Sequence, residues 1–313
     1  MWTIPGEQVE RLRALFPAHT ILHARDDAEV APMIAEADVL FSSHVHRHQL
    51  AAAARLRWIH SPAAGVGNML YPEMVASPVV MTNSRGLSAD VIAEHVLALS
   101  LAFYRQLPLA FRRQDERRWA QDEVGALNRT ITGTRVLIVG LGAIGRAVAA
   151  RFTALGARVA AIRRQATAEG VAGVDAVYPP GALRQQLPSA DVVVLTAPQT
   201  EETRDLIGAA ELALMKRDAI LVNVSRGGLV DEAALASALR TGTLRGAALD
   251  VFRGEPLGPE SPLWNVPNLL ITPHTAGFRE DHWAAATDLF AGNLRRFERA
   301  EPLLNIVDKQ AGY

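Results

Sequence analysis

The chain has 313 residues, of which 49% are hydrophobic and 21% are charged, and its formal net charge is -1. This composition is typical of a globular protein large enough for two domains. The near-zero charge gives no electrostatic basis for binding nucleic acid or an anionic membrane. The absence of cysteine excludes disulfides, thiolate metal sites and a cysteine nucleophile. We expect a cytoplasmic protein, because cysteine is absent and the sequence has neither an apolar run long enough to span a membrane nor a signal-peptide pattern.

Short apolar runs alternate with helical patterns in the first hundred residues, which indicates a parallel α/β sheet. Strands are expected over residues 20–23, 38–41, 56–60 and 79–82, and helices over residues 7–16, 28–37 and 88–103. Ser88 is expected to cap the last of these helices. Only four residues precede Pro5, too few for a normal strand. Either the chain starts late or a first strand is lost, which would leave one sheet edge uncovered.

The same alternation continues in the second half of the chain, so a second parallel sheet is expected there. Strands are expected over residues 135–139, 158–162, 191–195, 219–224, 246–251 and 269–272, and helices over residues 144–155, 231–240 and 287–300. Asp231 is suited to cap the second of these helices. Between the two halves, residues 107–127 are rich in charge, and they form either a solvated face or an arm that reaches over a partner subunit.

Residues 135–145 (RVLIVGLGAIG) have the pattern of a buried strand, a glycine turn and the start of a helix. Gly140, Gly142 and Gly145 have the G-x-G-x-x-G spacing. In that pattern the first glycine permits the tight turn, the second lets a pyrophosphate approach, and the third allows close helix–strand packing. The helix N-terminus favours the phosphate charge. The strand over 158–162 completes a βαβ unit of about 30 residues, which favours dinucleotide binding over an ordinary glycine turn.

The residues after this second strand indicate which dinucleotide binds. NAD-binding units place an acidic residue there for the ribose 2′-hydroxyl. Here the position holds Arg163, followed by Arg164 and Gln165. A guanidinium group binds a 2′-phosphate through paired charged hydrogen bonds. We therefore predict that NADP(H) is the preferred cofactor, with NAD(H) possible; the alternative is that both arginines are solvated surface charge.

Three polar residues each follow a buried strand in the second half of the chain: Arg226, Glu255 and His274. The carboxyl ends of parallel strands meet at one edge of a sheet, the same edge as the glycine turn. An arginine can hold the carboxylate and carbonyl of a 2-oxo acid. A histidine can protonate the carbonyl oxygen while hydride reaches the carbon, and a carboxylate can orient the imidazole and raise its pKa. The alternative is that all three are solvated loop residues.

Two further segments of the first half are candidates for ligand binding. Residues 61–67 (SPAAGVG) follow a strand, and their glycine N–H groups suit an anion such as a carboxylate, although an ordinary strand-to-helix turn is the alternative. His44, His46 and His48 would share one face of an extended segment. No acidic ligand is nearby in sequence, so we predict no metal site and interpret them as a solvated turn or a wall of the substrate pocket.

Four segments resemble the D-isomer-specific 2-hydroxyacid dehydrogenase family, in the family's order and spacing. They are 139–145 (VGLGAIG), 222–231 (VNVSRGGLVD), 248–256 (ALDVFRGEP) and 273–277 (PHTAG). The resemblance covers nearly the whole chain, and the two arginines at 163 and 164 place it nearest the glyoxylate/hydroxypyruvate reductase branch. It implies an α/β fold of two Rossmann-like domains with doubly wound parallel sheets and a cleft between them. Residues 1–98 plus 286–313 would form a flavodoxin-like substrate domain and residues 99–285 the dinucleotide-binding domain.

The resemblance also implies roles for individual residues. Arg226 would bind substrate, Glu255 would partner the histidine, His274 would donate the proton, and Asp250 would approach the nicotinamide carboxamide. The predicted substrate-binding residues are Ala64, Gly65, Val66, Gly67, Arg226 and His274. The predicted cofactor-binding residues are Gly140, Leu141, Gly142, Ala143, Ile144, Gly145, Arg163, Arg164, Thr196, Ala197, Pro198, Thr203, Val224, Ser225, Arg226, Asp250, His274, Ala276 and Gly277. A homodimer through the cofactor domain is implied as well.

The leading hypothesis is therefore an NADPH-dependent reductase of a small 2-oxo acid, glyoxylate or hydroxypyruvate. One alternative is a dehydrogenase of another anion, such as phosphite or a bulkier 2-hydroxy acid. Another is a dinucleotide-sensing protein like the transcriptional corepressors that share this fold. One departure from the family pattern is Asn68, where many relatives carry an acidic residue. The substrate, the physiological direction and the roles of Ser42, Ser43 and His44 are open at this level.

Overall fold

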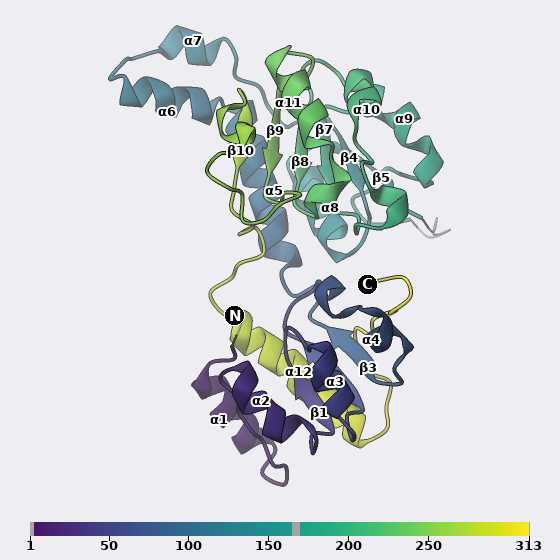
Figure 1. The fold of residues 1–313 in the computed structure, drawn as a ribbon. Helices are drawn as coiled ribbons and strands as arrows, with labels where there is room; N and C mark the ends of the chain where they lie inside the picture. Colours follow the sequence, from purple (N-terminus) through teal and green to yellow (C-terminus); the bar gives the residue numbers. More distant parts are fainter. Residues whose placement is uncertain (1–2, 165–169, 313) are drawn as a thin grey trace. The chain divides into compact units, whose positions relative to one another are not determined.

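The computed structural model describes residues 3–164 and 170–312, which form two compact units (Figure 1). The terminal unit comprises residues 1–87 and 279–313, and the central unit comprises residues 88–278. The divisions expected at 98/99 and 285/286 fall inside helices α5 (Ala89–Tyr104) and α12 (His282–Glu298), and each of these helices belongs whole to one unit. Gln165, named beside the two arginines, lies outside the described residues.

A seven-stranded parallel sheet forms the centre of the central unit, in the order β10-β9-β8-β7-β4-β5-β6. Its strands are β4 (Arg135–Val139), β5 (Arg158–Ile162), β6 (Ala176–Tyr178), β7 (Val192–Leu195), β8 (Ile220–Asn223), β9 (Gly246–Leu249) and β10 (Leu269–Ile271). The strand order reverses between β4 and β7, so the predicted doubly wound sheet is confirmed. Ligands of such sheets bind at the carboxyl ends of the strands beside this reversal. The short strand β6 was not predicted.

Helices cover both faces of this sheet, which explains why its middle strands are apolar at nearly every position, the exceptions being Arg135 at the start of β4 and Asn223 at the end of β8. Val136 and Ile138 pack with α5 and α8 (Ala143–Ala154). Leu137 and Val139 face the opposite layer. That layer contains α9 (Leu183–Gln186), α10 (Ala209–Leu214) and α11 (Glu232–Arg240). Alternate residues of a strand point to opposite faces, so a strand buried on both faces must be apolar throughout.

The long apolar helix α5 forms as predicted and packs along α8 (Figure 1). Its fit to the sheet is close, because a Cβ added at Gly246 would lie 2.5 Å from the ring of Phe103. Ser88 is the N-cap residue, but its side chain makes no capping hydrogen bond to any described residue, so that expectation was wrong. Asp231 does cap α11, since its Oδ1 accepts from the N–H groups of Ala233 and Ala234.

The terminal unit has a three-stranded parallel sheet, in the order β1 (Val39–Phe41), β2 (Trp58–Ser61) and β3 (Val80–Asn83). Helices α1 (Gly6–Leu15) and α12 pack on one face, where the ring of Phe290 stacks on Phe41 and Trp58 with centroid separations of 4.6 and 5.2 Å. The remaining helices of this unit are α2 (Asp27–Ile34), α3 (Arg47–Ala52) and α4 (Pro72–Ala76). Helix α12 begins five residues before the predicted start at 287.

The strand expected over residues 20–23 does not form, and that prediction was wrong. A strand requires a neighbour to complete its hydrogen-bond ladder, and the outer edge of β1 has no strand beside it within residues 3–164 and 170–312. Arg13 of α1 binds this segment instead, because its guanidinium donates to the carbonyl of Ile21 at 3.0 and 3.3 Å. Within the described residues no strand therefore pairs with this edge of the sheet, although Ile21 packs in the same apolar cluster as Val39 and Phe41 of β1.

Helices α6 (Leu107–Asp115) and α7 (Gln121–Gly125) extend away from the central sheet (Figure 1). None of their residues is buried, and Arg113 holds the two together through bonds of 2.6 to 3.2 Å to Glu123. Short 3₁₀ helices occur at Gly67–Met69, Pro180–Ala182, Leu187–Ser189, Glu201–Thr203, Gly227–Leu229 and Pro262–Asn265. Among the described residues, every helix is too short or too polar to cross a lipid bilayer.

Candidate active site

The glycine turn between β4 and α8 shows why each glycine is needed. Gly140 has φ +105°, and a Cβ there would lie 2.4 Å from the backbone nitrogen of Ala197. A Cβ on Gly145 would lie 2.2 Å from the carbonyl oxygen of Gly140. A Cβ on Gly142 would meet no described atom within 4 Å. The first and third glycines are therefore fixed by packing, whereas the second leaves open space above the N-terminus of α8, as a bound pyrophosphate requires.

The other predicted cofactor residues of this unit lie in the loops that follow the neighbouring strands, so they share the edge of the glycine turn. Thr196 Oγ1 donates to the carbonyl of Gly140 at 2.5 Å. The Ser225 hydroxyl donates to the carbonyl of Ala197, and Thr203 Oγ1 donates to that of Pro198 at 2.7 Å. These bonds join the loops after β4, β7 and β8 into one continuous rim.

Arg163 follows β5 at the same edge, and its backbone N–H donates to the carbonyl of Tyr178 at 2.9 Å. Its Nη1 atom is buried without a hydrogen-bond partner among residues 3–164 and 170–312. A buried charged donor without a partner is costly, so a ligand acceptor at this position would be favourable. Together with the open space at Gly142, this orphaned donor leaves room and a hydrogen-bond donor for a nicotinamide dinucleotide.

Glu255 and His274 form a direct contact. The Nδ1 atom of His274 lies 2.6 Å from Oε2 of Glu255, and the other carboxylate oxygen accepts the backbone N–H of Phe252 at 2.8 Å. His274 has φ +55°, in the left-handed region that residues with a Cβ seldom adopt. Such backbone strain persists only where the surroundings enforce it, and it is common at functional sites.

Asp250 holds the loop that carries His274. Its side chain is 1% exposed and accepts hydrogen bonds from the Thr272 hydroxyl at 2.5 Å and from the backbone of Thr275 and Ala276 at 3.0 Å. His95 of α5 completes this network, with Nε2 3.0 Å from the Thr272 hydroxyl. The sequence did not single out His95, because its contact with a loop 177 residues later depends on the packing of α5. The contact predicted between Asp250 and the cofactor carboxamide stays a prediction.

Arg226 lies in a tight turn after β8. The amide of buried Asn223 donates to the Arg226 carbonyl at 2.9 Å, and its oxygen accepts from the Ser225 N–H at 3.1 Å. Asn223 was not predicted to take part in the site, although a polar residue at the end of an apolar strand is a usable signal for such a role. A Cβ on Gly227 would lie 1.9 Å from the carbonyl carbon of Phe252, so this turn packs directly against the loop that leads to Glu255.

The three candidate catalytic residues line one groove of the central unit, so the structure brings them together as the strand ends predicted. The groove is lined by Gln199, Arg204, Arg226, Gly227, Gly228, Phe252, Arg253, Glu255 and His274. Arg204 pairs with Glu201, and Arg253 pairs with Asp205. Arg226 has no acidic partner among the described residues and donates to the Ser225 carbonyl at 2.6 Å. Its charge is thus available to an anion.

The predicted substrate loop, 64–67, belongs to the terminal unit and follows β2 at the carboxyl edge of that sheet. The Asn83 amide donates to the Ala64 carbonyl at 2.7 Å, which ties this loop to the end of β3. Asn68, where the family pattern favours an acidic residue, donates to the Ser43 carbonyl at 3.1 Å. A carboxylate could not donate this bond, so the departure at position 68 has a structural counterpart in the loop after β1.

A glycine turn at the reversal of a doubly wound sheet, next to an arginine and a hydrogen-bonded carboxylate–imidazole pair, defines a dinucleotide-dependent oxidoreductase. Residues 97–276 match the family described as D-isomer specific 2-hydroxyacid dehydrogenase, NAD binding domain. The chain belongs to this family, and it is an NAD(P)-dependent oxidoreductase that acts on CH–OH groups. Its central unit contains the nicotinamide-dinucleotide-binding domain.

Individual relatives have several activities. A glyoxylate reductase from Korarchaeum cryptofilum is 37% identical over 264 residues, which are 83% of this chain and 78% of the relative. A D-3-phosphoglycerate dehydrogenase from Methanocaldococcus jannaschii is 32% identical over 288 residues, and the chain spans about half (53%) of its length. The crystal structure of an NADPH-dependent glyoxylate/hydroxypyruvate reductase from Sinorhizobium meliloti with NADP and sulfate aligns with a TM-score of 0.83 and 28% identity, over 99% of this chain and 97% of that one.

Proposed function

We propose that this enzyme reduces a small 2-oxo acid, glyoxylate or hydroxypyruvate, with NADPH as the preferred reductant. The observation that carries the proposal is the Glu255–His274 pair in one groove with the guanidinium of Arg226, which has no acidic partner among the described residues. This set suits a substrate in which a carbonyl group is next to a carboxylate. Arg226 supplies the positive charge that binds the carboxylate, and His274 supplies the proton for the carbonyl oxygen. The names of the glyoxylate reductase relatives support the choice of small acids.

The roles of the protein groups follow from their contacts. When bound, the reduced nicotinamide supplies a hydride to the C2 carbon of the oxo acid. Arg226 binds the carboxylate and carbonyl oxygen and so fixes the face of C2 that is presented. His274 gives the proton on Nε2 to the carbonyl oxygen, which becomes the hydroxyl. Glu255 accepts a hydrogen bond of 2.6 Å from the Nδ1–H group of His274. It thereby sets the orientation of the ring and stabilises the imidazolium before proton transfer.

The preference for NADPH rests on Arg163 and Arg164 at the end of β5. A 2′-phosphate would give the orphaned Nη1 of Arg163 the acceptor that it lacks among the described residues. A charge-assisted bond to a phosphate is worth more than the bond to a neutral hydroxyl. The glycine rim would hold the pyrophosphate through its backbone N–H groups.

We infer a homodimer as well, formed through the central unit. None of the residues of helices α6 and α7 is buried. The segment 107–125 that they form exposes Phe111 and Trp119, and Trp119 is 90% accessible. Large aromatic residues exposed on a projecting segment are typical of surfaces that a partner covers. Sedimentation velocity tests this: a dimer that becomes a monomer in Trp119→Ser/Phe111→Ser supports the inference, and an unchanged mass contradicts it.

The experiment that tests the activity measures initial rates with five acids. Glyoxylate, hydroxypyruvate, pyruvate and phenylpyruvate are each tested with NADPH and with NADH, and 3-phosphoglycerate is tested with NADP⁺ and with NAD⁺. Fast NADPH oxidation with glyoxylate and hydroxypyruvate is the expected result. Activity with NADH alone would remove the phosphate interpretation of the two arginines but leave the catalytic set standing. Tight dinucleotide binding with no turnover on any acid would contradict the reductase and favour the sensor.

A further inference from the structure

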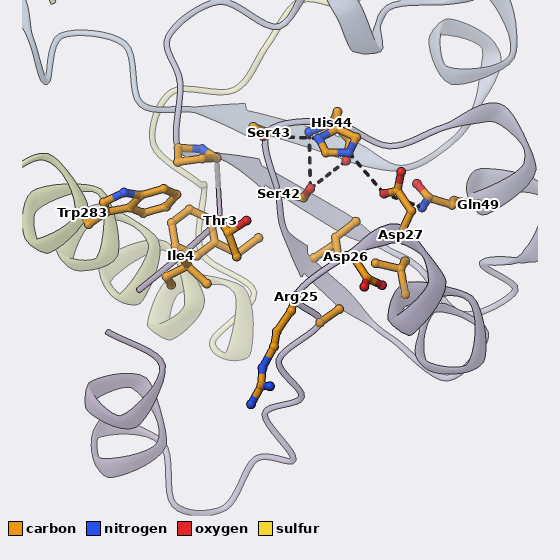
Figure 2. Close-up of a pocket in the computed structure, with 15 residues that line it drawn as sticks. Thr3, Ile4, Arg25, Asp26, Asp27, Ser42, Ser43, His44, Gln49 and Trp283 are labelled. Carbon is orange, nitrogen blue, oxygen red and sulfur yellow. Dashed lines mark hydrogen bonds and ion pairs between the residues drawn. The ribbon is translucent and has the colours of Figure 1, made fainter. Parts of the chain in front are cut away.

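A second cluster of functional side chains lies in the terminal unit, away from the predicted catalytic residues in sequence. The two oxygens of Asp27 meet two imidazoles: Oδ1 lies 3.4 Å from Nε2 of His44, and Oδ2 lies 3.2 Å from Nε2 of His46. Figure 2 shows Asp27 and His44 pointing toward each other from α2 and from the loop after β1. The two ring nitrogens and a carboxylate oxygen all lie within 4.8 Å of one another.

These separations suit a shared cation. With metal–ligand bonds of about 2.0–2.1 Å and tetrahedral angles, the ligand atoms are about 3.3 Å apart. Each imidazole nitrogen lies at this distance from one of the two Asp27 oxygens, 3.4 Å from Oδ1 for His44 and 3.2 Å from Oδ2 for His46, and the three ligand atoms lie within 4.8 Å of one another. Half of the His46 side chain is exposed, so small changes in its position can adjust the distance between the two nitrogens. Two imidazoles and one carboxylate also leave one coordination position for water.

Outer contacts hold the three candidate ligands in place, as they do in metal sites. The Nδ1 atom of His44 lies 3.4 Å from the Ser43 hydroxyl, which leaves Nε2 as the ligating nitrogen. Buried Gln49 donates to Oδ1 of Asp27 at 3.5 Å, and its oxygen accepts the backbone N–H of His46 at 2.8 Å. One side chain thus fixes both the carboxylate and the backbone of the histidine opposite it.

We propose that Asp27, His44 and His46 bind one divalent transition-metal ion, with Zn²⁺ as the best fit. Imidazole nitrogens favour zinc and its neighbours in the first transition row over Ca²⁺ and Mg²⁺, which prefer oxygen ligands. The ion would join the start of α2 to the loop that follows β1. That loop is linked to the 64–67 loop through the bond from Asn68 to Ser43, so the metal would stiffen this edge of the terminal sheet.

His48 provides a matched control. It is exposed and its ring stacks on His46 with centroids 5.6 Å apart, yet it is not among the three candidate ligands. It therefore shares the local sequence and the solvent access of the site without sharing its geometry.

The test is isothermal titration calorimetry of Zn²⁺ binding to the full chain. The protein carries no histidine tag and is first stripped of metal with a chelator. We expect one Zn²⁺ per chain, and a loss of affinity of at least about 10-fold in each of Asp27→Asn, His44→Gln and His46→Gln but not in His48→Gln. Co²⁺ in place of Zn²⁺ should give visible absorption bands of tetrahedral intensity that the same three variants lose. Circular dichroism of the metal-free variants checks that each one folds.

Thermal unfolding gives an independent measurement. At a free Zn²⁺ concentration 100-fold above Kd, the unfolding midpoint of the terminal unit should rise by roughly 5–10 °C, and Asp27→Asn should abolish the rise. No stoichiometric binding would overturn the proposal. Binding that survives Asp27→Asn and His46→Gln would overturn it too, because the ion would then lie elsewhere, for example at Glu255 and His274. Equal loss in His48→Gln would contradict the ligand assignment. None of these measurements depends on the proposed activity.

Discussion

Nδ1 of His274 lies 2.6 Å from Oε2 of Glu255, and the second oxygen of the same carboxylate accepts the backbone N–H of Phe252. The main chain after β9 thus aims the carboxylate, and the carboxylate aims the imidazole. The left-handed backbone of His274 and the Asp250 network fix the loop from the other side. The pair is therefore organised within the central unit alone, before any substrate binds.

Replacement of His274 by alanine should lower kcat for 2-oxo acid reduction by at least about 100-fold, because the proton donor is lost. The affinity for NADPH should change little, since the glycine rim and the β5 arginines are untouched. Stopped-flow rates at saturating cofactor and fluorescence titration of NADPH measure the two quantities separately. Weakened NADPH binding with normal turnover at saturation would contradict the assigned role.

Glu255→Gln tests the carboxylate charge with little change in shape. The amide oxygen can still accept the Phe252 N–H, so the loop should keep its fold, whereas the imidazolium loses its counter-charge. We expect kcat to fall by about 10–100-fold, within the range that a general acid contributes. Glu260→Gln, at an exposed position farther along the same loop, is the matched control and should retain full activity. An unchanged kcat in Glu255→Gln would remove the carboxylate from the mechanism.

The cofactor preference can be measured in the double variant Arg163→Ala/Arg164→Ala. The wild-type chain should bind NADPH roughly 100-fold more tightly than NADH, and the double variant should lose most of this ratio by weakening NADPH alone. Arg158→Ala removes a guanidinium at the opposite end of the same strand and should leave the ratio unchanged. Equal dissociation constants for the two cofactors in the wild type would show that the arginines do not read the 2′-phosphate.

The two strands on either side of the glycine turn could be predicted to the residue and helix α8 to within one residue at each end, whereas β6 and the segment 20–23 could not be predicted correctly. Strands β4 and β5 are buried, apolar and bounded by glycine or arginine, so composition alone delimits them. Strand β6 consists of three half-buried residues and is not part of an apolar run in the sequence. The segment 20–23 has strand composition but lacks a neighbour, and hydrogen-bond ladders depend on partners that a local pattern does not contain.

The candidate site divides in the same way. Strand ends placed Arg226, Glu255 and His274 at one edge, since parallel strands bring their carboxyl ends together. The residues that hold them, such as Asn223 and His95, make contacts that only the packed loops define. Asp27, on a helix, and His44, in a loop, are in contact although they are 17 residues apart in the sequence. A search for acidic neighbours in the sequence therefore could not find it.

Asn68→Asp should weaken the link between the loops after β1 and β2. The amide donates to the Ser43 carbonyl at 3.1 Å, and a carboxylate would place an acceptor against that carbonyl. We expect the free energy of unfolding to fall by about 1–2 kcal/mol, and by less in Asn68→Ala, which removes the donor without adding charge. Urea unfolding at pH 7 measures both variants. Equal stability of the aspartate variant and the wild type would show that this bond contributes nothing.

A buried histidine makes the stability of the terminal unit depend on pH. His60 is fully buried, with Nδ1 2.6 Å from the Thr82 hydroxyl and Nε2 3.3 Å from that of Ser84. Burial lowers the pKa of His60 to about 4, against about 6.5 in the unfolded chain. Between these values the unfolded state binds a proton that the folded state does not. Its contribution to stability is complete above about pH 6.5 and decreases as pH falls toward 4.

At pH 5 this difference should cost the folded state about 2 kcal/mol relative to pH 7.5, since each pKa unit corresponds to about 1.4 kcal/mol. Urea unfolding of the wild type and of His60→Asn at both pH values isolates the effect, because the carboxylates titrate equally in the two proteins. Asparagine keeps a polar atom near Thr82 but cannot be protonated. Between pH 7.5 and pH 5, the free energy of unfolding of His60→Asn should therefore fall by about 2 kcal/mol less than that of the wild type. His48→Asn, at an exposed position, should follow the wild type. Parallel pH dependences for the wild type and His60→Asn would mean that His60 is protonated as readily in the folded chain as in the unfolded one.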